Sequence, residues 1–193
     1  MKVISGTLKG RKIEGYNLEG TRPTMDRVKE SLFAMIQDNL KDSIVLDLFA
    51  GSGGLGIEAI SNGAKQCYFI DHNNEVIKTL NKNINNLNIK DKSKVVLSDW
   101  KKFLNESAKN NLKFDIIFVD PPYEYDVYEK ILEKVSTLNL LNDNGLIILE
   151  HANLNLKEEY NGLVLYKSKK YGNKSVNIYK TCWHLFFNML YFK

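Results

Sequence analysis

The stretch that decides the fold runs Val45-Leu46-Asp47-Leu48-Phe49-Ala50-Gly51-Ser52-Gly53-Gly54-Leu55-Gly56. An apolar run rich in branched residues ends at a glycine-rich turn, and a helical pattern of apolar residues begins after that turn. This order predicts a strand, a tight turn and a helix, the first half of a βαβ unit. Glycines let the backbone pass close to a ligand, and the start of a helix offers free N–H groups to a polar group.

The glycines alone leave the type of cofactor open. Gly51, Gly53 and Gly56 also fit the G-x-G-x-x-G pattern of dinucleotide sites, so an NAD-dependent oxidoreductase is one alternative. Asp47 favours another ligand, because a carboxylate near the end of the strand would face a cofactor that carries positive charge. We therefore predict a site for S-adenosylmethionine (SAM), with contacts from Asp47 and from the turn residues Phe49, Ala50, Gly51, Ser52 and Gly53.

The bulk composition predicts one soluble domain. The 193 residues are 44% hydrophobic, which is enough for a single core. Two cysteines give no disulfide framework, and three scattered histidines match no metal-ligand spacing. The first residues do not resemble a signal peptide, and no apolar run is long enough to span a membrane. We expect a cytoplasmic monomer that has no structural metal and no membrane partner.

Strands and helices are predicted to alternate through most of the chain. Further strands are expected at 66–71, 94–100, 114–120 and 145–150, followed by an antiparallel pair at 162–167 and 175–179. In the helix with the apolar stripe Val76, Leu80, Ile84 and Leu87, the Lys and Asn residues are interpreted as a solvated face. The alternation predicts an α/β fold whose mostly parallel seven-stranded sheet has helices on both faces.

Two further strand ends carry acids. Asp71 follows the glycine turn by about 20 residues, where an acid in Rossmann-like folds accepts hydrogen bonds from the ribose hydroxyls. Asp99 and Trp100 are expected to end the third strand, with Asp99 accepting from the adenine amino group and Trp100 packing near the adenine ring. These residues complete the predicted cofactor site.

A second site is predicted where the fourth strand ends in Asp120-Pro121-Pro122-Tyr123. The two prolines have no N–H, so their carbonyls act only as acceptors. The Asp120 carboxylate and the Pro121 carbonyl would each accept one proton of an exocyclic base amine, while Tyr123 would stack on the base. Fixed acceptors of this kind stabilise the charge that develops as the amine attacks a methyl group, without a metal or a strong base.

All three arginines of the chain lie within its first 27 residues. Arg11, Arg22 and Arg27 are followed only by lysine as a cation, and the net charge is a mild +4. A guanidinium binds phosphate in a bidentate manner and stacks on bases, which lysine does not do. A hairpin at 3–13 and a helix after Thr24, its predicted N-cap, would carry these arginines at a polar end that suits phosphate.

The motif residues give the chain a resemblance to a known family. Asp47 to Gly56, Asp71, Asp99 and the Asp120–Tyr123 motif occupy the motif positions of Class I SAM-dependent methyltransferases. Three stretches narrow the resemblance to the RsmD family of 16S rRNA guanine-N2 methyltransferases: Ile4-Ser5-Gly6 with Gly10-Arg11, Thr21 to Glu30, and Asp47 to Gly53. Tyr171-Gly172 also matches a late family motif, although Lys169-Lys170 stand where arginine is more usual.

The resemblance implies a single SAM-dependent domain at 1–180, whose residues 1–40 contact RNA. Its implied reaction is methyl transfer to a guanine N2 amine in 16S rRNA of the 30S subunit, with S-adenosylhomocysteine as product. The alternatives are a DNA adenine-N6 methyltransferase and a non-catalytic RNA-binding assembly factor. Residues 181–193 depart from the family pattern, and we expect this apolar tail to have no catalytic role.

Overall fold

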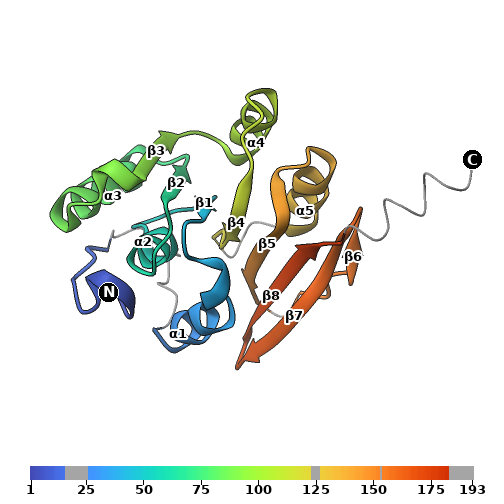
Figure 1. The fold of residues 1–193 in the computed structure, drawn as a ribbon, viewed down its shortest axis with the longest axis horizontal. Coiled ribbons are helices and arrows are strands. Elements are labelled where there is room, and N and C mark those ends of the chain that lie inside the picture. The colour runs from blue at the N-terminus through green and yellow to red at the C-terminus, as the bar shows by residue number, and fades with distance from the viewer. Residues whose placement is uncertain (16–25, 123–126, 153, 183–193) are drawn as a thin grey trace, which may run out of the picture.

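One mixed β-sheet forms the centre of the molecule. The computed structural model describes residues 1–15, 26–122, 127–152 and 154–182. In these residues the strands follow the order β3-β2-β1-β4-β5-β8-β7-β6 (Figure 1). The first five are parallel to one another, namely β1 Ile44–Asp47, β2 Gln66–Asp71, β3 Ser93–Leu97, β4 Phe114–Val119 and β5 Leu141–His151. The strand order changes direction between β1 and β4, so that pair marks the topological switch point.

The other end of the sheet is antiparallel. It consists of β6 Glu159–Tyr160, β7 Leu163–Tyr171 and β8 Lys174–Thr181, and β8 pairs with β5. The sequence predicted the antiparallel pair but only seven strands, whereas eight are present in the described residues. The extra strand, β6, has two residues, and so short a segment carries no alternation of apolar and polar residues that could reveal it.

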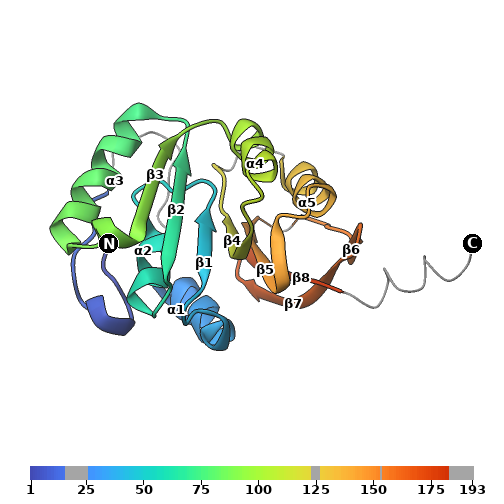
Figure 2. The same cartoon turned by 45° about the horizontal axis from the view of Figure 1, so that its top comes forward.

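Helices cover both faces of the sheet, as Figure 2 shows. One face carries α1 Asp26–Met35, α2 Gly54–Ser61 and α3 Asn74–Leu87, and the other carries α4 Trp100–Lys109 and α5 Tyr128–Thr137. Short 3-10 turns occur at Gly6–Leu8, Gln37–Asn39 and Lys90–Lys92. The helices of each face bury their apolar stripes against the sheet, so the molecule has two hydrophobic cores separated by one layer of strands.

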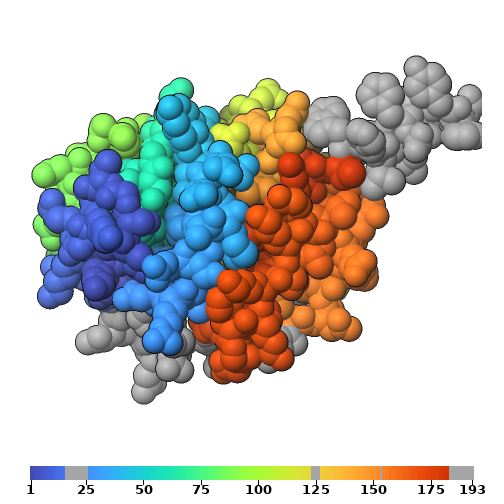
Figure 3. Space-filling model, turned by 60° about the horizontal axis from the view of Figure 1, so that its bottom comes forward, coloured from blue at the N-terminus to red at the C-terminus, as the bar shows by residue number. Residues whose placement is uncertain are grey.

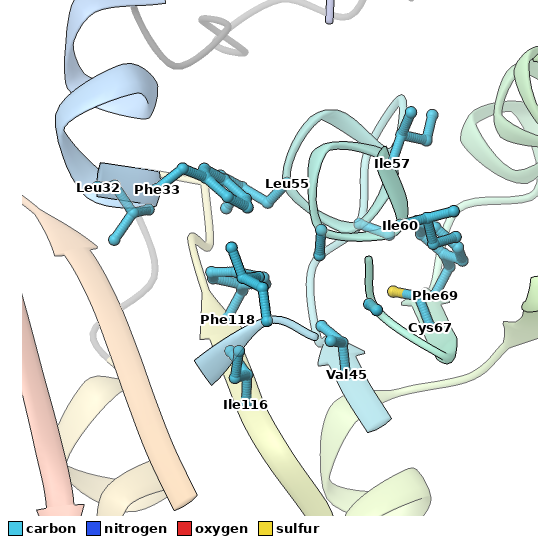
Figure 4. Close-up of a cluster of buried hydrophobic side chains, with 14 of the residues drawn as sticks. Leu32, Phe33, Val45, Leu55, Ile57, Ile60, Cys67, Phe69, Ile116 and Phe118 are labelled. Atoms are coloured by element: carbon cyan, nitrogen blue, oxygen red, sulfur yellow. The ribbon is translucent and has the colours of Figure 1, made fainter. Parts of the chain in front are cut away.

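The alternation of side chains along β4 divides its residues between the two cores. Phe118 packs on the side of α1 and α2, whereas Ile117 and Val119 pack on the side of α4 and α5. Figure 4 shows Phe33 of α1 and Leu55 of α2 gathered over Phe118. The ring centroids of Phe33 and Phe118 are 5.7 Å apart, so α1 is held directly against the strand that leads to the Asp120 turn.

One predicted strand is shorter than expected, and a helix follows it. The third strand ends at Leu97, and Asp99 is the N-cap of α4 rather than the end of a strand. Its Oδ1 accepts from the backbone N–H of Lys101 at 2.8 Å, and Trp100 is the first helical residue. An aspartate before a helix is a typical cap, so the predicted strand through Trp100 is wrong at its end.

The N-terminal segment is folded back onto α2 by a buried carboxylate. Lys2 and Lys12 form an antiparallel bridge, and the backbone N–H groups of Val3 and Ile13 donate to the carbonyls of Arg11 and Met1, both at 2.9 Å, so the two arms of the predicted hairpin at 3–13 are paired. Glu58 of α2 accepts from the backbone N–H of Ile4 at 2.9 Å and of Ser5 at 2.7 Å. It also pairs with Lys29 of α1 at 3.1 Å, and both side chains are 1% exposed. This Glu58 clamp therefore joins the first residues, α1 and α2.

Candidate cofactor and acceptor site

The glycine turn and the start of the Asp120–Tyr123 motif come together where β1 and β4 end. Asp47 pairs in register with Phe118, and the backbone N–H of Leu48 donates to the carbonyl of Phe118 at 3.1 Å. The glycine turn that follows β1 therefore begins beside the Asp120 turn that follows β4. In open α/β sheets ligands bind at such a switch point, outside the carboxyl ends of the strands.

Asp47 is a buried acid that supports the start of α2. It is 2% exposed, and its Oδ2 accepts from the backbone N–H of Gly56 at 2.9 Å. Burial raises the pKa of Asp47 to about 7, helped by the charge of Asp71 and opposed by the Gly56 hydrogen bond. A buried acid that titrates near neutral pH gains most from a positive charge brought close to it, so Asp47 fits a cationic ligand.

The glycine turn needs its glycines for two different reasons. Gly51 and Gly53 have positive φ values of 55° and 88°, which favour glycine, and Gly53 directly precedes α2. A Cβ on Gly56 would lie 2.3 Å from Phe69 and 2.6 Å from the Sγ of Cys67. Gly56 thus lets α2 pack closely on β2, while Gly51 and Gly53 shape the turn beside the predicted ligand.

Asp71 closes the glycine turn from the neighbouring strand. Its Oδ2 accepts from the backbone N–H of Gly51 at 3.1 Å, and its Oδ1 accepts from the N–H of Asn73 at 2.9 Å. Each carboxylate oxygen has further lone pairs, and the side chain is 13% exposed. Asp71 therefore keeps acceptor lone pairs beside the glycine turn, and its bonds to ribose hydroxyls stay a prediction.

Asp99 and Trp100 follow β3, and β3 lies on the opposite side of β2 from β1. Asp99 is exposed, and its Oδ1 is occupied by the cap of α4. Trp100 is 6% exposed and packs in the core under α4. Their adenine-binding roles stay predictions, and the burial of Trp100 means that its ring contributes to the core in any case.

The described part of the Asp120–Tyr123 motif continues β4 at the same edge. Asp120 is half-buried, Pro121 is buried and Pro122 is exposed. Tyr123 lies outside the described residues, as does Arg22 of the predicted RNA-binding set. Phe49, Ala50 and Ser52 line the adjoining turn, so the predicted cofactor and acceptor residues share one edge of the sheet.

The two described arginines lie on the outside of the N-terminal part. Arg11 is exposed and donates from Nη2 to the carbonyl of Asn86 at 2.7 Å, while Arg27 is exposed in the first turn of α1. Arg11 is thereby directed toward the end of α3. Phosphate binding by either residue stays a prediction.

Asn83 is a supporting residue that the sequence did not reveal. The amide is 1% exposed on α3, although the Asn residues of this helix were interpreted as solvated. Its Oδ1 accepts from the N–H of Glu14, and its Nδ2 donates to the carbonyls of Glu14 and Ser52 at 2.9 and 3.0 Å. One side chain thus holds the N-terminal segment and the glycine turn together.

A buried ion pair next to Asp120 was also missed. Asp120 and Glu150 come one position after the paired residues Val119 and Leu149, so they lie near the carboxyl ends of the neighbouring strands β4 and β5. Nζ of Lys174 on β8 contacts Oε1 of Glu150, and Oε2 of Glu150 has no hydrogen-bond partner in the described residues. Lys174 compensates the buried charge of Glu150 and ties β8 to the edge where the acceptor motif begins.

Two classes of site are not found in the described residues. No group of three His, Cys, Asp or Glu side chains there is arranged to hold a metal ion, and no helix there has the length and hydropathy of a membrane span.

A polar surface hollow lined by Asp42, Asp115 and Asp143 lies at the amino ends of the strands, away from the predicted site. The oxygens of Asp115 already accept from Ile44 N–H and from Asn142.

Fold and site together define the class of protein. The parallel sheet changes strand order between β1 and β4, a glycine turn follows β1, and an acid ends β2. These features are those of the Rossmann-like fold of Class I methyltransferases. The solved structure of a candidate methyltransferase of Escherichia coli, yhhF, superposes with a TM-score of 0.83 at 31% identity, over 94% of this chain and 97% of that one.

Sequence comparison narrows the class to one family. The family described as "Conserved hypothetical protein 95" matches residues 1–180, and the chain belongs to it. YlbH, a candidate rRNA methyltransferase of Bacillus subtilis, is 39% identical over 93% of this chain and 98% of its own length. Ribosomal RNA small subunit methyltransferase D of Haemophilus influenzae is 34% identical over 86% and 92%. These relatives confirm the resemblance to the RsmD family.

Proposed function

We propose that the protein transfers a methyl group from SAM to the exocyclic N2 amine of a guanine in 16S rRNA. The observation that carries the proposal is the meeting of two turns at one sheet edge. The glycine turn after β1 and the Asp120 turn after β4 are linked by the hydrogen bond from Leu48 to Phe118. A cofactor held by the first turn would lie next to an amine held by the second.

The cofactor would be held by residues that suit its parts. Asp71 would accept from the ribose hydroxyls, and the buried Asp47 would favour the cationic end of the ligand. Asp99 and Trp100 are proposed for the adenine ring. When bound, SAM supplies an electrophilic methyl group on a positively charged sulfur, which leaves as the neutral thioether of S-adenosylhomocysteine.

The chain's own contribution to the reaction is to hold and orient the amine. A base amine is a poor nucleophile because its lone pair is delocalised into the ring. The Asp120 carboxylate and the Pro121 carbonyl accept hydrogen bonds from its two N–H groups, which directs the lone pair toward the methyl group and stabilises the developing positive charge. Asp120 or water then takes up the proton that the methylated amine loses, and Tyr123 is proposed to stack on the base.

The substrate part of the proposal is supported by relatives and by surface chemistry. The names of the relatives from Bacillus subtilis and Haemophilus influenzae both give ribosomal RNA as the substrate, and the name of the second specifies the small subunit. Arg11 and Arg27 are exposed on the N-terminal part, where they would contact phosphates together with Arg22. We propose that the substrate is presented as part of a 30S particle, and that the protein acts as a cytoplasmic monomer without a metal.

The test is methyl transfer from labelled SAM to four samples in parallel. These are 30S particles, protein-free 16S rRNA, duplex DNA and a sample without acceptor. We expect N2-methylguanine in the 16S rRNA, and Asp120→Ala should lower the rate by roughly 100-fold or more while SAM affinity remains within about twofold. Asp120→Asn is the matched variant, because it keeps an acceptor oxygen and loses the charge.

The four samples separate the proposed reaction from its alternatives. Methyladenine in the DNA sample would replace the proposal with a DNA adenine-N6 methyltransferase. SAM binding and RNA binding without transfer to any acceptor would indicate a non-catalytic assembly factor. A fully active Asp120→Ala enzyme would contradict the role given to Asp120.

A further inference from the structure

The positive charge of the chain is concentrated in the β7–β8 hairpin. Residues 163–181 contain five lysines and no aspartate or glutamate, whereas the whole chain has a net charge of +4. The rest of the chain is therefore close to neutral. Elsewhere in this lysine-rich chain, acids lie among the lysines. On α3 Lys78 pairs with Glu75, and on α4 Lys102 pairs with Glu106.

An exposed aromatic side chain lies among these lysines. Tyr166 is 54% exposed, and the other exposed large hydrophobic residues of the described part, Leu97 and Leu154, are not aromatic. Nζ of Lys167 lies 4.9 Å from the centroid of the Tyr166 ring, and Nζ of Lys180 lies 5.6 Å from it. Aromatic rings bordered by cations are the usual platform for an unpaired base, because the base stacks while the cations contact phosphates.

The hairpin surface is continuous with α1. Lys169 donates from Nζ to Oγ of Ser31 at 2.8 Å, and Lys167 donates to the carbonyl of Met35 at 3.2 Å. Figure 3 shows α1 between the N-terminal segment and the hairpin on one face of the molecule. Arg27, already proposed to contact RNA, is exposed in the first turn of this helix, so both sets of cations belong to one side of the protein.

We propose that the β7–β8 hairpin is an RNA-binding surface on which Tyr166 stacks an unpaired base. We call the set Tyr166, Lys167, Lys169 and Lys180 the hairpin surface. The proposal rests on the proposed RNA substrate and names where that RNA continues beyond the reacting nucleotide. Phosphate contacts from the lysines supply affinity, and stacking on Tyr166 selects a segment whose bases are not paired.

The first test measures the salt dependence of binding of the full-length protein to protein-free 16S rRNA. The variant Lys180→Gln avoids the two lysines that contact α1. It should lower the slope of log K against log salt by about 0.7, because one phosphate contact is lost. The matched control Lys130→Gln removes one exposed lysine from α5, on the opposite face, and should keep the wild-type slope.

The second test separates stacking from charge. Tyr166→Ala should weaken RNA binding roughly tenfold and raise KM for RNA, with kcat unchanged at saturating RNA. Tyr166→Phe keeps the ring and should bind as the wild type does. Wild-type binding by Tyr166→Ala, or a control slope for the hairpin lysine variant, would overturn the proposal.

If the hairpin lysines served only to protect the edge of the sheet, the lysine variant would behave differently. Beyond Val164, β7 has no outer strand partner in the described residues, and lysines on an open edge prevent pairing between molecules. If that were their role, the lysine variant would self-associate on size exclusion and bind RNA normally, which would overturn the proposal. A wild-type protein that binds and methylates no RNA would instead contradict the proposed function itself.

Discussion

Asp47 is an acid whose burial moves its titration into the neutral range. It is buried under the glycine turn, and its pKa is raised to about 7, so both its charged and neutral forms are populated near neutral pH. Below that pH the neutral form is favoured. Its stabilising contribution is complete below the ordinary value of 3.8 and is lost as the pH rises through about 7.

Binding of a cationic ligand should therefore release a proton from Asp47. If the positive charge of SAM favours the ionised acid, SAM affinity should rise roughly tenfold between about pH 6 and about pH 8 and then level off. Calorimetry in buffers of different ionisation enthalpy would measure both the affinity and the number of protons released.

The control for this prediction is Asp47→Asn. The amide oxygen can still accept from Gly56, but the side chain no longer titrates. The SAM affinity of this variant should depend on pH only through the titration of groups on SAM itself. An equal slope in Asp47→Asn and the wild type would show that Asp47 does not respond to the ligand charge.

Most of the predicted site residues end a strand or shape a turn. Asp47, Asp71 and Asp120 follow apolar runs directly, so their place at the sheet edge can be predicted from local pattern. Asn83 and Glu58 could not be found in this way, because their partners lie far away in the sequence, for example at Ser5 and Ser52. A polar residue on an amphipathic helix is usually solvated, and only the packed fold shows the exceptions.

At the scale of elements, local pattern located most strands but not their ends. The strand at 66–71 was predicted with its observed bounds, because it lies between a glycine turn and an acidic end. Helix α4 was not predicted, since the cap at Asp99 was interpreted as a strand end. The buried positions Trp100, Phe103, Leu104 and Ser107 follow helical spacing, and that spacing was the signal that could have found it.

The docking of the N-terminal segment gives a prediction about a single glycine. Gly6 has a φ of 75°, and a Cβ there would lie 2.0 Å from the carbonyl oxygen of Ser61. Gly6→Ala should therefore lower the free energy of unfolding by at least about 2 kcal/mol, since a backbone atom of α2 cannot move aside easily. Urea unfolding followed by circular dichroism would measure the change.

Gly10 offers the matched comparison. Its φ is 83°, but a Cβ at Gly10 would meet nothing within 4 Å. Gly10→Ala should cost only the conformational strain of a left-handed residue, about 1–2 kcal/mol. Equal losses for the two variants would mean that contact with Ser61 does not determine the need for Gly6.

At the scale of the whole molecule, the two cores share one sheet. Every strand from β1 to β5 contributes side chains to one or both faces, so neither core can form without the other. The predicted single domain at 1–180 should then unfold in one cooperative step, with equal calorimetric and van't Hoff enthalpies. Two separated transitions in scanning calorimetry would contradict this prediction.

The sequence predicts that the centre of the sheet is parallel, but it does not predict the full order of the strands. Alternating strands and helices predict right-handed crossovers and a parallel centre. The insertion of β8 between β5 and β7 and the length of β5 depend on pairing between distant segments, such as Leu149 with Asn177. Local periodicity contains no information on such partners, so the order of the strands had to come from the structure.

The Glu58 clamp also limits how this family can diverge. The backbone N–H of Ser5 donates to Glu58, the Ser5 hydroxyl lies within hydrogen-bond distance of both Glu58 and Asn62, Gly6 lies against Ser61, and Lys29 neutralises the buried acid. A change at any one of these positions leaves another without its partner, so a viable lineage must replace the set together or keep it whole. Aligned sequences should therefore show the residues at positions 5, 6, 29 and 58 inherited as one unit.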